Sequence, residues 1–143
     1  MLATIQTRLK AQLPAARWVG VEIAEDIDAF SDRAGQVESG TAIIMPWGEQ
    51  AQPQQDATGA FRQLVRTVFA IGVVIRHYDH LMGADRALQF DTYKADLEAA
   101  MAGWEPNGTL DPFELVGGES SPVTTGVSIY VQTWACTRIL TGA

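Results

Sequence analysis

The chain has 143 residues, of which 47% are hydrophobic and 19% charged, and its net charge is −7. These values predict one globular domain over residues 1–143 and exclude a disordered chain, and no Pro-, Ser- or charge-rich linker divides it. The acidic balance argues against a nucleic-acid-binding surface, which needs clustered Lys and Arg. An acidic or neutral wall would still suit a pore through which DNA passes.

Cysteine usage and apolar runs bear on the compartment. Cys136 is the only cysteine, so no internal disulfide can form, which fits a reducing cytoplasm. Residues 1–10 lack the apolar core of a signal peptide. The longest apolar run, Val68 to Ile75, is far too short to span a bilayer as a helix. We therefore expect no membrane segment.

The first third of the chain predicts short alternating elements. Leu2, Ile5 and Leu9 recur at helical spacing, and Pro14 ends that amphipathic helix. In the following acidic helix we expect Ile27 and Phe30 to share one side. Further elements are a short strand at 18–23, this helix at 25–33, a loop at 35–40 and an apolar strand at 41–47.

Residues 48–59 (GEQAQPQQDATG) are polar and offer almost nothing to bury. The pattern is typical of a loop, or of a segment that becomes ordered on contact with a partner. We take it as one candidate patch for a contact between subunits.

Residues 62–77 carry the longest strand signal. The odd positions from Val65 to Ile75 suit a core-facing side at period two. The even positions are also apolar at the centre of the strand, so either the chain's own helix or another subunit must cover them. We therefore predict a set of subunit-interface residues: Arg62, Arg66, Val68, Ala70, Gly72, Val74 and Arg76.

Residues 85–104 give the best helix signal, and Gly103 and Pro106 supply its stop. The predicted apolar face consists of Leu88, Tyr93, Leu97, Met101 and Trp104. The predicted solvated positions are Asp85, Gln89, Asp96 and Glu98.

Two strands are predicted after this helix. A modest strand at 110–116 is expected to end at Gly117-Gly118, and a loop (GGESSP) should lead into a long, half-buried strand at 123–140. The whole order predicts an α+β domain, with a mostly antiparallel sheet of about four to five strands and helices packed on one face.

Three patterns could carry chemistry, and for each a structural interpretation is favoured. Residues 35–41 (GQVESGT) have the glycine spacing of a phosphate-binding loop but lack its lysine, so a plain turn before a strand is expected. His77, Asp79 and His80 could ligate a metal, but a zinc site needs three or four ligands, so a polar strand end or a subunit contact is preferred. Ser120 and Ser121 have no nucleophile motif, and a hairpin tip is predicted.

Acidic and aromatic residues are interpreted in the same way. The carboxylates of Glu22, Glu25, Asp26, Asp28 and Asp32 are expected to form a solvated helix face, with contact to a basic partner or a wall facing DNA as alternatives. The four tryptophans favour core or subunit-interface packing, because the basic groove of a base-stacking protein is missing. We expect no catalytic residue, no cofactor and no metal.

The ordered set of segments resembles a known family. It comprises AIIMPW, a Gln-rich loop, FRQLVRTVFAIGVVIRH, AAMAGWEP, LVGGESSP and SIYVQTWACTRI. Over roughly residues 1–140 this order and spacing is similar to that of the tail terminator proteins of long-tailed bacteriophages, distant relatives of minor tail protein U of lambda-like phages.

The resemblance implies a structural virion protein of the tail or neck, assembled in the host cytoplasm. It implies a ring, usually hexameric, that ends tail tube polymerisation and joins the tail to the head-side connector, or stopper, with genomic DNA passing through its lumen without sequence-specific binding. The implied partners are other copies of the chain, the tail tube protein and the connector. A head-completion or neck protein, and a small enzyme or ligand-binding α+β domain, stay open as alternatives.

Overall fold

The computed structural model describes residues 1–54, 61–76, 83–124 and 126–142. Side chains are described for these residues except 83–87 and 121–124. Three helices and five strands form the domain: α1 (Leu2–Gln12), β1 (Gly20–Ile23), α2 (Ile27–Ala34), β2 (Thr41–Ala51), β3 (Arg62–Arg76), α3 (Gly83–Met101), β4 (Glu114–Thr124) and β5 (Val127–Thr141). This order is the one predicted from the sequence.

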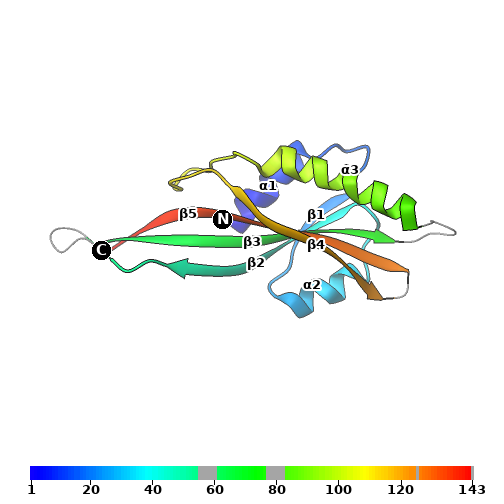
Figure 1. Ribbon diagram of the computed structural model, residues 1–143, viewed down its shortest axis with the longest axis horizontal. Coiled ribbons are helices and arrows are strands. Elements are labelled where there is room, and N and C mark those ends of the chain that lie inside the picture. The colour runs from blue at the N-terminus through cyan, green and yellow to red at the C-terminus, as the bar shows by residue number, and fades with distance from the viewer. Residues whose placement is uncertain (55–60, 77–82, 125, 143) are drawn as a thin grey trace.

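The five strands form one twisted sheet in the order β1-β2-β3-β5-β4 (Figure 1). Only the β1–β2 pair is parallel, and the other three neighbouring pairs are antiparallel. β3 lies at the centre, where it pairs over its whole length with β5. The predicted α+β class with a mostly antiparallel sheet is therefore confirmed.

Helices α1 and α3 cover one face of the sheet. Ile5 and Leu9 of α1 and Leu97 and Met101 of α3 are fully buried against sheet residues that include Ile71. The helical spacing of these side chains aligns them on one stripe per helix. α3 ends through Gly103, whose φ of +76° suits a residue without a Cβ.

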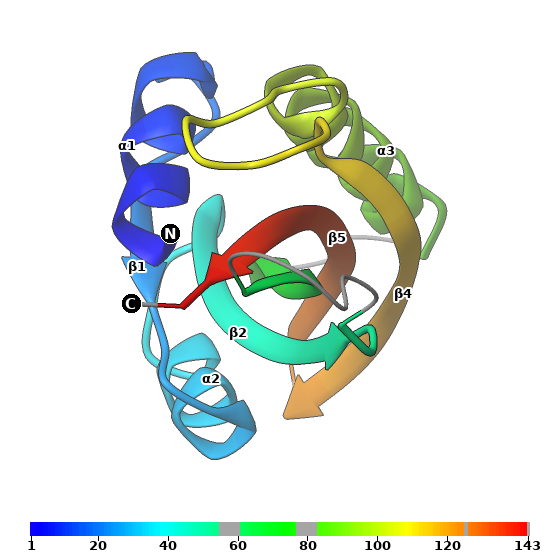
Figure 2. The same ribbon diagram turned by 90° about the vertical axis from the view of Figure 1, so that its left-hand side faces the viewer.

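Helix α2 packs on the opposite face, which corrects the prediction that all helices share one face. Phe30 is 1% exposed, and its ring lies so close to Gly72 of β3 that any larger side chain there would meet it. A second core cluster forms around it, separate from the first. Ile27, predicted to share the buried side with Phe30, is instead 56% exposed. Figure 2 shows α2 on one side of the sheet and α1 with α3 on the other.

The first residues of the predicted loop at 48–59, and the predicted loop GGESSP, belong to strands; residues 55–59 lie outside the described residues. β2 does not stop at Trp47 but continues to Ala51, with a register shift between Pro46 and Gly48. β4 runs from Glu114 to Thr124 through the GGESSP segment, so Ser120 and Ser121 pair with β5 and do not form a hairpin tip. Neighbouring strands supply hydrogen-bond partners along these stretches and outweigh the turn preference of Gly and Pro.

The apolar face predicted for α3 is partly wrong. Leu88 is 65% exposed, whereas Leu97 and Met101 are buried as predicted. Phe90, which the prediction left out, packs against the core. Asp96 is not solvated: only 12% of its side chain is exposed.

Candidate subunit-contact surface

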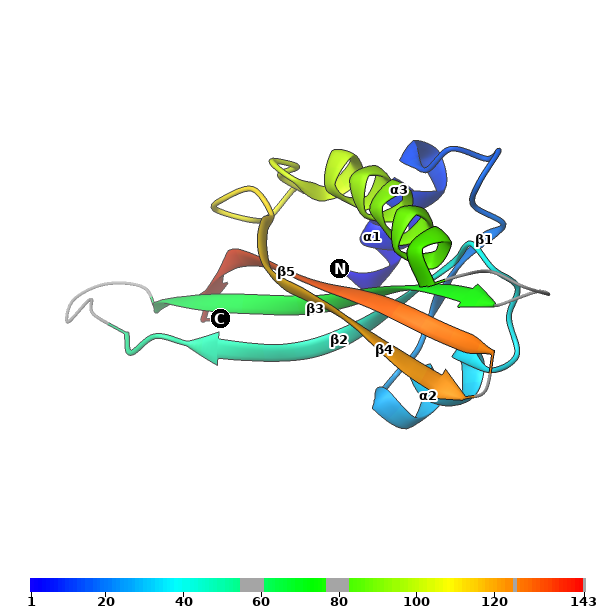
Figure 3. The ribbon, with the colours of Figure 1, turned by 45° about the vertical axis from the view of Figure 1, so that its right-hand side comes forward.

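One end of the sheet extends beyond the helices (Figures 1 and 3). It consists of residues 47–51 of β2, residues 61–68, which begin one residue before β3, and residues 137–142, which end one residue after β5. We call this three-stranded extension the arm. Among the described residues, the helices lie over the rest of the sheet in Figures 1 and 3, and only the start of α1 borders the base of the arm. Figure 2 looks along the arm from its tip.

Backbone pairing holds the arm together. β3 pairs there with β2 on one side and β5 on the other, down to the Arg62–Thr141 pair. The Gln63 amide adds a hydrogen bond of 2.8 Å to the carbonyl oxygen of Gln52. β-branched residues such as Val65 and Thr67 favour this extended conformation. The arm is therefore an ordered continuation of the sheet.

The arm exposes apolar side chains. Large hydrophobic residues that are exposed by 37% to 57% are Trp47, Phe61, Leu64 and Leu140. Single exposed apolar residues are ordinary, but four on one short extension make it a candidate contact surface. Leu64 and Leu140 lie on opposite faces of the sheet, because Leu140 pairs with Gln63. Phe61, Leu64 and Leu140 are not among the contact residues predicted from the sequence. The period-two pattern contained the signal for Leu64, which occupies an even position of β3.

The arm also carries guanidinium groups. Arg66 forms an ion pair of 3.2 Å with Glu114 of β4, and Arg138 forms one of 3.1 Å with Glu49 of β2. Arg62 has no ion-pair partner among the residues that the structure describes. Exposed pairs of this kind contribute little to stability, so their arginines remain able to bind acidic groups elsewhere.

The predicted interface residues fall into three places. Arg62, Arg66 and Val68 lie on the arm and remain candidates for a subunit contact. Ala70, Gly72 and Val74 are buried under α2, so the alternative that the chain's own helix covers this face is the one observed.

Arg76 lies at the other end of β3 and is engaged within its own chain. Its guanidinium donates to the carbonyl oxygens of Gly35 and Val37, the first bond being very short and the second 2.6 Å long. Arg76 thus holds the segment between α2 and β2 against the sheet.

That segment includes the glycine-spaced residues 35–41. The carbonyl oxygen of Gly35 at its start accepts a hydrogen bond from Arg76. Gly40 has a φ of +84°, and a side chain at this position would meet the carbonyl oxygen of Arg17. The segment is a plain turn before a strand, as predicted. His77, Asp79 and His80 lie outside the described residues.

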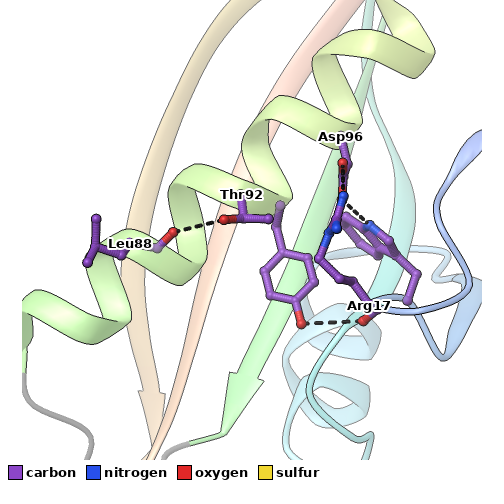
Figure 4. A network of polar contacts seen from close by, with 6 residues as sticks. Arg17, Leu88, Thr92 and Asp96 are labelled. Atoms are coloured by element: carbon purple, nitrogen blue, oxygen red, sulfur yellow. Dashed lines mark hydrogen bonds and ion pairs between the residues drawn. The ribbon is translucent and has the colours of Figure 1, made fainter.

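A polar network fastens the α1–β1 connection to α3 (Figure 4). Arg17 donates two hydrogen bonds, of 2.9 and 2.7 Å, to the Asp96 carboxylate, and the Trp18 indole donates a third of 2.9 Å. The Arg17 bonds, more than that of Trp18, hold the pKa of Asp96 below its usual value, although burial opposes them. Burial raises the pKa of the neighbouring Tyr93 phenol. The network is a structural tie between two elements.

A groove with a volume of about 460 Å³ separates the start of α1 from the base of the arm. Its lining includes Leu2, Phe69 and Cys136, and burial raises the pKa of the Cys136 thiol to about 11. The thiol is therefore a poor nucleophile at neutral pH. Among the described residues, no three His, Cys, Asp or Glu side chains gather as metal ligands.

The fold and the arm define a class of protein: a small α+β domain whose distinguishing feature is an exposed extension of its sheet. The described helices include none long and apolar enough to cross a membrane. The sequence pattern of the family described as "Phage tail terminator protein" matches residues 2–142, and the chain belongs to this family. No curated protein sequence matches the chain.

Membership has direct consequences. The family is one of structural phage tail proteins and not of enzymes, so the chain is a component of the virion that interacts with other tail parts. This confirms the resemblance found in the sequence.

Proposed function

We propose that this protein forms a homo-oligomeric ring, hexameric as in its family, that ends polymerisation of the tail tube. The other side of the ring joins the tail to the head-side connector. The family match over residues 2–142 is the observation that carries this proposal.

The arm supports self-assembly. Closed rings of identical subunits use heterologous contacts, in which one patch meets a different patch on the next copy. An arm that projects from the body can reach a neighbour, and its exposed Trp47, Phe61 and Leu64 would lose water contact there.

The charge fits passage of DNA. With a net charge of −7 per chain, a ring would carry a strongly acidic field that discourages DNA from adhering to its lumen. The further partners of the proposal are the tail tube protein and the connector, and assembly takes place in the host cytoplasm.

The test is negative-stain electron microscopy of particles from a phage that lacks this protein, with and without the wild-type chain supplied in trans. Tails of uncontrolled length, or finished tails detached from filled heads, are expected without it. Tails of normal length joined to heads would contradict the terminator role and favour a different morphogenesis protein.

A further inference from the structure

A second contact surface lies between β1 and α2. A groove of about 520 Å³ is lined there by the apolar residues Leu2, Ile23, Ala24, Ala29 and Pro46, together with the charged residues Glu22, Glu25 and Arg33. Beside it Ile27 is 56% exposed and Ile23 42% exposed. We call this surface the α2 groove. Its apolar floor sets it apart from an ordinary solvated helix face.

The charges of the α2 groove are negative. Residues 22–33 contain five carboxylates and a single guanidinium, Arg33, which pairs with Glu22 at 2.7 Å. Asp26 caps α2 by accepting a hydrogen bond of 2.8 Å from the backbone N–H of Ala29. Glu25, Asp28 and Asp32 are exposed and form no ion pair with any described residue.

The charges of the arm are positive. Its 19 described residues contain Arg62, Arg66 and Arg138 against the single carboxylate Glu49, in a chain whose net charge is −7. Asp56 in the connecting segment leaves the balance positive. The arm and the α2 groove are therefore complementary in charge, and both expose apolar side chains.

The arm cannot reach the groove of its own chain. It continues the sheet away from α2 (Figure 1), and the cross-strand pairing of three strands keeps it extended. Six residues of paired strand span roughly 20 Å, enough to bridge to an adjacent molecule. The partner that fits the groove is a second copy of this chain.

We propose that the arm of each subunit docks in the α2 groove of the next, with Arg62 and Arg66, which share one face of β3 with Leu64, facing Glu25 and Asp32 across apolar contacts of Leu64 and Ile27. The contact is heterologous, and its repetition gives a ring where the rotation from one subunit to the next closes. This inference rests on the proposed ring and identifies the surfaces that build it. It also gives the carboxylates Glu25 and Asp32, which form no ion pair with any described residue, a partner in the next subunit.

The test is a charge swap. The arm variant R62E/R66E and the groove variant E25K/D32K each place like charges opposite one another, and each should weaken ring formation at least tenfold in native mass spectrometry and sedimentation velocity. The combined variant, R62E/R66E/E25K/D32K, should recover most of it. D91K/E105K changes the charge as much as E25K/D32K at exposed positions outside both surfaces, and should form rings like the wild type.

Folding is checked by circular dichroism, and all samples are measured with and without tail tubes from the deletion phage. Folded single-surface variants that still form rings, or a combined variant without recovery, would overturn the docking and leave the ring intact. A wild-type chain that stays monomeric even on tubes would overturn the ring itself. If the arm variant forms normal rings that fail to bind tubes, the arm contacts the tail tube protein and not a second copy of the chain. This result too would overturn the docking.

Discussion

The body of the sheet and the arm are made from the same strands but differ in what covers them. In the body, α1 and α3 cover one face and α2 the other, so the middle of β3 is buried on both sides. In the arm, the start of β3 retains exposed side chains such as Leu64. The difference teaches that strand pairing can continue where burial is only one-sided: the body is covered on both faces, whereas in the arm Val65 is buried and the even-numbered side chain of Leu64 remains available to a partner.

The largest effect on stability is expected at Phe30. Replacing this 1% exposed ring with Ala leaves a cavity between α2 and β3, so Phe30→Ala should lower the free energy of unfolding by about 3–5 kcal/mol in urea denaturation. Ile27→Ala, on the exposed side of the same helix, should change it by less than ~0.5 kcal/mol. Equal losses would show that α2 does not pack as described.

Gly72 tests the same contact from the sheet side. A methyl group added there would overlap the Phe30 ring, so Gly72→Ala should cost about 1–3 kcal/mol through overpacking. Gly48→Ala in the arm meets no atom within 4 Å and should be neutral or slightly stabilising in the same urea titration. A reversed order of the two variants would refute the contrast between body and arm.

The Arg17–Asp96 tie should give a smaller, pH-dependent effect. The folded pKa of Asp96 lies below its unfolded value of 3.8, so the stabilisation is complete above about pH 5 and declines as pH falls through the folded pKa. Asp96→Asn should therefore flatten the acid side of a stability–pH profile. Asp91→Asn, at an exposed position of the same helix, should leave the profile unchanged, and identical profiles for the two variants would contradict the tie.

The smallest effect on stability is expected at Leu64. Because its side chain is 37% exposed, Leu64→Ala should cost the isolated subunit less than its neighbour Val65→Ala, which empties a site 4% exposed. In thermal melts at a concentration where the chain is monomeric, Val65→Ala should show the larger drop in Tm. Ring formation should be weakened more by Leu64→Ala than by Val65→Ala, because Leu64 is the residue proposed to contact a second copy of the chain.

The sequence by itself determined the order of helices and strands, the α+β class and the family, because periodicity and segment spacing are local properties of the chain. Only the tertiary structure decided that α2 covers Gly72 from the opposite face, that β2 and β4 run through Gly- and Pro-containing segments, and that Asp96 is paired with Arg17. These outcomes depend on contacts between residues far apart in the chain. Apolar residues at both odd and even positions show that both faces of β3 are apolar at its centre. The position of α2, about 40 residues earlier in the chain, decides which part of the strand stays open for a neighbour.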